Sequence, residues 1–254
     1  MATFIAVMAG LMLGSFLSVL LDRWEHKEGI VAGRSHCPQC LRTLAWYDLI
    51  PLVSWLSLRG SCRYCLARIS VLYPVLELAM AAALGFYVWR TGAPTLWTLS
   101  ELVVLFVLVS LFFFDLKWQL LPDVFTYGLS AIVLARLIGL RPDLLVNSVA
   151  TALLLTAAFF LLYTLTRGRG IGFGDVKLAF AIGLLFGYPG AIGVTLAAIW
   201  AGALWGVGLM VSGRATMKTA LPFGSFWTAA AIVTVIWPGP LYWLAGLVLP
   251  FSLR

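Results

Sequence analysis

The chain has 254 residues, of which 62% are hydrophobic and 11% are charged. This composition excludes an ordinary soluble domain, in which about a quarter of the residues are charged, and is typical of a polytopic helical membrane protein. The net charge of +7 does not require a nucleic-acid partner, because basic residues that flank membrane spans account for it. We therefore expect an all-α polytopic protein in a lipid bilayer, with no nucleic-acid partner.

The first apolar run covers residues 2–21 and predicts a retained transmembrane helix, because it lacks the basic start and small-residue cleavage site of a signal peptide. The only long polar stretch, residues 22–72, follows it. Seven more apolar runs predict further spans: 73–87, 96–114, 124–140, 144–165, 176–186, 191–211 and 226–249. We therefore predict about eight transmembrane helices, with uncertain ends for the shorter runs.

The distribution of basic residues predicts an orientation. If residues 22–72 lie in the cytoplasm and the spans alternate, 13 of the 17 Lys and Arg residues fall on the cytoplasmic side. Short cytoplasmic loops of membrane proteins carry this kind of excess. The sequence thus predicts that the polar stretch is cytoplasmic and that both termini lie on the opposite side.

All four cysteines lie in the polar stretch. They form two C-x2-C pairs, Cys37 with Cys40 and Cys62 with Cys65, separated by 21 residues. Each pair can present two thiolates to one ion, and two pairs complete a tetrahedral zinc site. Two disulfides are the alternative, which a reducing cytoplasm disfavours. The spacing therefore predicts a structural zinc site with four thiolate ligands.

Two aspartates lie at the ends of predicted spans. Asp115 ends the third span, and Asp175 begins the sixth within the sequence Gly172-Phe173-Gly174-Asp175. With alternating spans, both emerge at one membrane face although 60 positions separate them. Ionisable groups at such positions usually mark function, and two adjacent carboxyls can act as the acid and base of an aspartic protease. The alternative for Asp175 is a simple helix cap.

The helix ends suggest different roles for the two carboxyls. Asp175 starts a helix, whose partial positive charge favours a carboxylate, whereas Asp115 ends one. We therefore expect Asp175 to hold the charge and Asp115 the shared proton. Lys117 and Lys177 each follow an aspartate by two positions, and the alternative for both is contact with lipid head groups.

Taken in chain order, these features resemble the type IV prepilin peptidases, which are GxGD-type membrane aspartic proteases. The resemblance covers nearly the whole chain and rests on the following segments: 14–19 with Arg23, 37–40, 46–51, 54–60, 62–65, 69–70, 73–74 with Glu77, 115–123, 172–177 and 221–224. The GxGD sequence alone would be weak, but these ordered segments together with the cysteine spacing are specific.

The resemblance implies that Asp115 and Asp175 are the catalytic pair of an aspartic endopeptidase. It implies supporting roles for five loop residues: Gly172, Gly174, Lys177, Pro122 and Asp123. The implied substrates are type IV prepilins or type II secretion pseudopilins. Their short basic leaders would be removed at the cytoplasmic face of the bacterial inner membrane.

The resemblance further implies that the new N-terminal residue is methylated by S-adenosylmethionine. That activity is tied to the cysteine-containing domain, and Gly60 matches a position linked to it. The expected domains are residues 1–21, a first transmembrane helix; residues 22–72, the zinc-binding and methyltransferase part; and residues 73–254, a membrane peptidase with seven helices.

Three residues depart from the family's usual pattern. Ser18 stands where Asn is usual, Leu72 where Arg is common, and Ser225 where Pro is common. The first two flank the cytoplasmic domain and bear on methylation, whereas none of the three replaces an aspartate.

Three other functions compete with the bifunctional enzyme. One is a peptidase without methylation. Another is a transporter that couples ions through Asp115, Asp175, Glu77 and Glu101, although visible inverted repeats and a midplane location are lacking. The third is a presenilin-like protease, which would not explain the paired cysteines.

Overall fold

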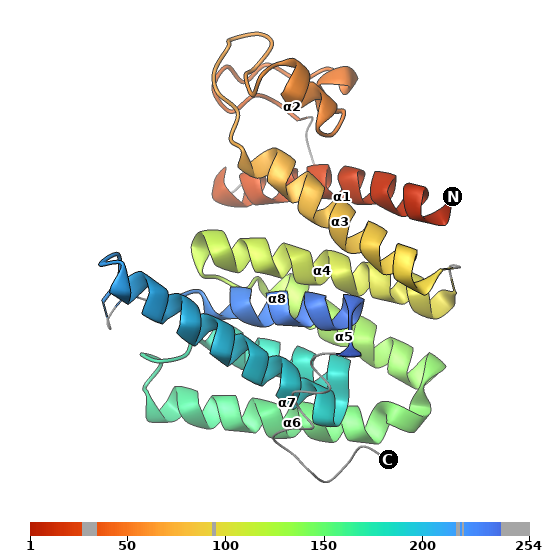
Figure 1. Ribbon diagram of the computed structural model, residues 1–254, viewed down its shortest axis with the longest axis vertical. Coiled ribbons are helices and arrows are strands. Elements are labelled where there is room, and N and C mark those ends of the chain that lie inside the picture. The colour runs from red at the N-terminus through yellow and green to blue at the C-terminus, as the bar shows by residue number, and fades with distance from the viewer. Residues whose placement is uncertain (27–34, 93–94, 217–218, 220, 240–254) are drawn as a thin grey trace. The chain divides into compact units, whose positions relative to one another are not determined.

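The computed structural model describes the whole chain except residues 27–34, 93–94, 217–218, 220 and 240–254. In the described part, regular structure is helical, apart from two isolated β-bridges in the cysteine-containing segment. The chain forms two compact units, residues 1–94 and 95–254 (Figure 1). An all-helical architecture was the expectation, and it is confirmed for the described residues.

In the first unit, helix α1 (Ala2–His26) packs against helix α3 (Leu72–Thr91). Two glycines of α1 allow this packing: a Cβ added at Gly10 or Gly14 would lie 2.5 Å from the Cα of Ala81 or Glu77, respectively. No side chain fits at that separation. Small residues at such contacts let membrane helices approach closely.

The segment between these helices holds the four cysteines. It contains the 3₁₀ helix η1 (Trp46–Leu49) and the short helix α2 (Val53–Ser57). Each β-bridge closes the loop around one cysteine pair, His36 with Thr43 and Ser61 with Arg68. The segment therefore folds as two similar loops joined by a short helical insert.

The described residues of the second unit form five helices: α4 (Leu96–Trp118), α5 (Asp123–Leu140), α6 (Pro142–Leu165), α7 (Phe173–Val211) and α8 (Phe223–Ile236). Helix α4 begins after Thr95, whose hydroxyl accepts the amide of Thr98 at 3.1 Å. Helix α8 packs against both α4 and α7 (Figure 1).

Helix α7 is interrupted at Gly187 and Tyr188, where the backbone angles are not helical. Asn147 of α6 satisfies the interrupted backbone: its side-chain amide donates to the Tyr188 carbonyl at 2.9 Å and accepts from the Tyr188 amide at 3.1 Å. The two predicted runs 176–186 and 191–211 thus lie on the two sides of this break.

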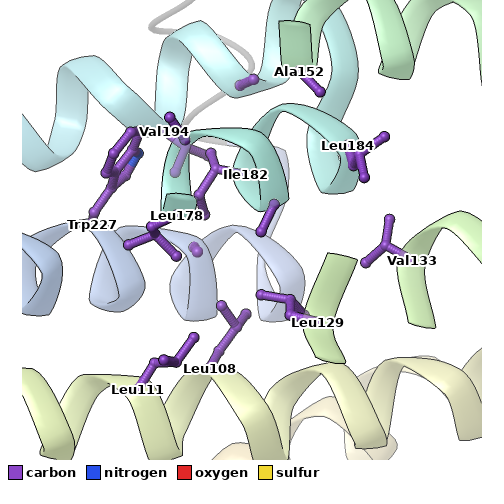
Figure 2. Packing of buried hydrophobic residues seen from close by; sticks show 14 of the residues in the cluster. Leu108, Leu111, Leu129, Val133, Ala152, Leu178, Ile182, Leu184, Val194 and Trp227 are labelled. Atoms are coloured by element: carbon purple, nitrogen blue, oxygen red, sulfur yellow. The ribbon is translucent and has the colours of Figure 1, made fainter. Parts of the chain in front are cut away.

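The core of the second unit forms where α4, α5, α6, α7 and α8 meet (Figure 2). Leu108 and Leu129 are fully buried there. Trp227 of α8 is also fully buried and stacks on Phe159 of α6 with ring centroids 4.5 Å apart. Helix α8 is therefore anchored against its neighbours by a large aromatic side chain.

Six described helices are long and apolar enough to cross a membrane: α1, α3, α4, α5, α6 and α7. The apolar helix α8 is shorter, with 14 residues. The predicted last span, 226–249, lies partly outside the described residues. The chain is thus a polytopic helical membrane protein, while the number of eight spans stays a prediction.

Candidate active site and metal centre

Asp115 lies in the last turn of α4 and is 5% exposed. Its Oδ2 atom accepts two hydrogen bonds from Ser225 in the first turn of α8, one from the amide at 2.5 Å and one from the hydroxyl at 2.8 Å. Both donors come from an element 110 positions away. The carboxyl group is therefore fixed by the packing of α8 against α4.

Asp175 lies in the first turn of α7 and is 9% exposed. Its Oδ2 atom accepts the amide of Gly172 at 3.3 Å, which is the helix-capping contact expected of an acidic residue at this position. A Cβ added at Gly174 would meet Leu121, from the loop after Asp115, at 3.4 Å. The GxGD loop thus packs against the segment that follows the other aspartate.

Both aspartates are buried in the same unit, and the GxGD loop before Asp175 packs against the segment that follows Asp115. Carboxyls that come close together in a site with little water can share one proton. We expected the helix ends to favour charge on Asp175 over Asp115. In the structure both carboxyls contact the first turn of a helix, Asp175 that of α7 and Asp115 that of α8, so the helix ends no longer distinguish their charges.

Gly224 and Ser225 were not predicted as site residues. A Cβ added at Gly224 would lie 2.9 Å from Cγ of Asp115, so only glycine allows this contact. A proline at position 225, the residue common in the family, would lack the amide that Asp115 accepts. The sequence contained one signal, the Leu221–Gly224 motif, but nothing in it linked that motif to Asp115.

The loop between α4 and α5 is connected to α7 by a salt bridge between Asp123 and Lys177. Lys177 therefore has an acidic partner within the protein, Asp123, whereas contact with lipid head groups alone was the alternative prediction. Pro122 is the N-cap of α5, and its carbonyl accepts the hydroxyl of Thr126 at 2.8 Å. Two of the predicted supporting residues, Asp123 and Lys177, are thus in contact, and Pro122 directly precedes Asp123.

The four cysteine sulfurs converge, all within 4.8 Å of one another. Those of Cys37 and Cys65, from different pairs, are 3.8 Å apart. Four thiolates bound to zinc at about 2.3 Å would be about 3.8 Å apart at tetrahedral geometry. The thiols are free rather than joined as disulfides, so the arrangement fits a zinc ion.

The two cysteine loops have matching backbone hydrogen bonds. The Cys37 amide donates to the Arg42 carbonyl at 3.0 Å, and the Cys62 amide donates to the Ala67 carbonyl at 2.8 Å. The residue after each pair, Leu41 or Leu66, has a positive φ that closes the turn. Each cysteine pair is therefore positioned by hydrogen bonds and a turn within its own short loop.

Asp48 of η1 connects the helical insert to the loop of Cys62 and Cys65 through hydrogen bonds. It accepts hydrogen bonds from Arg63 Nε at 2.8 Å, the Tyr64 hydroxyl at 3.1 Å and the Ala45 amide at 3.3 Å. Burial raises the pKa of Asp48, but these hydrogen bonds outweigh it, so that the pKa lies below its ordinary value.

The other acidic candidates have structural partners. Glu101 of α4 forms a buried salt bridge with Arg136 of α5 at 2.6 Å. Glu77 of α3 accepts the Leu52 amide at 2.8 Å, and it belongs to the first unit rather than to the aspartate pair's unit. These contacts remove the need for an ion-coupling role, which was the basis of the transporter alternative.

Comparison with known proteins gives a consistent result. Residues 8–91 match the family described as "Bacterial Peptidase A24 N-terminal domain", and residues 102–207 match the "Type IV leader peptidase family". No solved structure matches the chain.

Three curated relatives illustrate the similarity. A prepilin leader peptidase/N-methyltransferase of Aeromonas hydrophila is 34% identical, over 89% of this chain and 88% of the relative. The type 4 prepilin-like proteins leader peptide-processing enzyme of Escherichia coli O78:H11 is 34% identical, over 91% and 92%. A prepilin leader peptidase/N-methyltransferase of Myxococcus xanthus is 34% identical, over 99% and 77%. These matches, together with the cysteine cluster, establish that the chain belongs to the type IV prepilin leader peptidase family.

Proposed function

We propose that this chain removes the leader peptide of type IV prepilins or type II secretion pseudopilins and methylates the new N-terminal residue. The observation that carries the peptidase function is the burial of Asp115 and Asp175 in one unit, with the GxGD loop packed against the segment after Asp115. Family membership supports both activities, since relatives bear both in their names.

Asp115 and Asp175 act as the catalytic pair. The carboxylate of one takes a proton from water, and the resulting hydroxide attacks the scissile carbonyl while the other carboxyl donates a proton to its oxygen. Collapse of this intermediate breaks the C–N bond and protonates the leaving amine. Ser225 and Gly224 fix Asp115, and Gly172 fixes Asp175, so that little reorganisation is required.

The reaction takes place at the cytoplasmic face of the bacterial inner membrane, with both chain termini on the other side. The basis is the excess of Lys and Arg in the segments that this orientation places in the cytoplasm. The apolar helix of the substrate lies in the bilayer, and its basic leader extends into the cytoplasm.

The four cysteines bind one structural zinc ion, which joins the two cysteine loops. S-adenosylmethionine supplies an electrophilic methyl group: the new N-terminal amine forms the N–C bond, the C–S bond breaks to leave a neutral thioether, and the amine releases a proton. In this proposal, residues 22–72 carry the methyltransferase function and residues 73–254 carry the peptidase function.

The test is leader removal from a prepilin in proteoliposomes, read by intact mass, for the wild type, Asp115→Asn and Asp175→Asn, each with and without S-adenosylmethionine. We expect leader loss only in the wild type, and an added mass of one methylene only with S-adenosylmethionine. Cleavage by both variants at the wild-type rate would refute the catalytic pair. Cleavage without methylation would identify a peptidase alone.

A further inference from the structure

The first unit contains a cavity of about 290 Å³ that the peptidase reaction does not use. Its walls come from α1 and α3 on one side and from the cysteine-containing segment on the other. The lining residues include Asp22, Trp55, Tyr73 and Glu77. Its size approaches the range of roughly 300–1,000 Å³ that small-molecule sites occupy. The lining combines apolar side chains with serines and with charged groups of both signs, Asp22, Asp48 and Glu77 against Arg23, Arg63 and Arg68, so it offers defined polar partners to a ligand.

Two acidic side chains are fixed in the wall of this cavity. Glu77 is 7% exposed, and its Oε2 atom is held by the amide of Leu52 at 2.8 Å. Asp22 accepts the hydroxyl of Tyr73 at 3.4 Å. Because Arg23, Arg63 and Arg68 also line the cavity, the two carboxylates are local partners for the cationic groups and hydroxyls of a ligand rather than a source of overall negative charge.

Trp55 provides an aromatic wall. Its indole nitrogen donates to the Ile69 carbonyl at 3.4 Å, which fixes the ring. Gly60 packs against the ring: a Cβ added there would lie 2.9 Å from Cζ2 of Trp55, and the residue has a φ of +69°. A side chain at position 60 would therefore displace the ring, so glycine preserves the shape of this wall. Fixed aromatic rings of this kind stack well on nucleobases.

The cavity lies at the ends of two membrane helices. Glu77 is in the second turn of α3 and Asp22 is near the end of α1. A methyl donor bound there would lie close to the membrane surface, where the amine at the start of an apolar substrate helix emerges.

We propose that this cavity binds S-adenosylmethionine, with Trp55 against the adenine ring and with Asp22 and Glu77 facing the ribose hydroxyls and the cationic groups. The inference rests on the methylation proposed above. It assigns the methyl donor to the first unit, where the sequence alone offered no nucleotide-binding motif.

The test measures binding directly. The full-length wild type and variants, purified in detergent, are titrated with S-adenosylhomocysteine by isothermal calorimetry, and zinc content is measured to verify that the cysteine segment is folded. Glu77→Gln and Trp55→Ala should each weaken binding by about tenfold or more, whereas Trp55→Phe retains most of it.

The matched control is Trp46→Ala, because Trp46 lies in the same insert, is 76% exposed and does not line the cavity. It should bind as the wild type does. Leader removal by this control variant should also be unchanged. One outcome is that the wild type methylates while Glu77→Gln and Trp55→Ala bind S-adenosylhomocysteine as tightly as it does. In that case the cavity is not the site, and the proposed function stands. If the wild type neither methylates nor binds, the methyltransferase function itself fails.

Discussion

Removal of the Ser225 hydroxyl should slow leader cleavage. Ser225→Ala deletes the 2.8 Å hydrogen bond to Asp115 Oδ2 and keeps the amide bond to the same oxygen. Because Asp115 is only 5% exposed, water does not readily replace the lost donor. A hydrogen bond to a charged group contributes about 1.5–3 kcal/mol. If about 1.4 kcal/mol of this orients the carboxyl for catalysis, cleavage slows by about tenfold.

The assay is the initial rate of leader removal in proteoliposomes, with thermal unfolding measured in parallel. Ser225→Thr keeps the hydroxyl and should restore most of the rate. The matched control is Ser110→Ala, since Ser110 is a fully buried residue of α4 whose hydroxyl donates to the Phe106 carbonyl at 2.7 Å. It should keep the wild-type rate. Equal rates for Ser225→Ala and the wild type would refute the positioning role.

Three further predictions concern the first unit. Purified protein should contain one zinc ion per chain by elemental analysis, and Cys40→Ser should lower this content, whereas a metal-free protein with two disulfides would contradict the cysteine site. Asp48→Asn should destabilise the unit near neutral pH but not in acid. The reason is that the lowered pKa of Asp48 contributes stability above the ordinary pKa of about 3.9, and this contribution is lost as pH falls through the lower folded-state pKa. Chemical unfolding at pH 7 and pH 3 checks this, and a difference that persists undiminished in acid would disprove the charge argument. Gly14→Leu should destabilise the packing of α1 on α3 by about 1–3 kcal/mol. The control is Gly128→Leu, because a Cβ at Gly128 meets open space. The Gly14 variant should unfold at a lower temperature than this control.

The sequence by itself determined the features that depend on short spacings and bulk composition. The two C-x2-C pairs fold as separate local loops, so their spacing was enough to predict that four sulfurs converge, as they do. The long apolar runs predicted the helices because each run satisfies its own backbone hydrogen bonds in a membrane. Alternation of the spans also predicted that Asp115 and Asp175 lie at one membrane face; both are buried in the same unit, and their common face stays a prediction.

Only the tertiary structure decided which side chains meet across helices. Leu108 and Leu99 lie in the same helix, yet the first is fully buried and the second is 51% exposed. Both are leucine because lipid and protein core are equally apolar, so no polar stripe in the sequence marks the buried face of a membrane helix. The partners that depend on helix rotation, Ser225 with Asp115 and Glu101 with Arg136, were therefore hidden until the helices were packed.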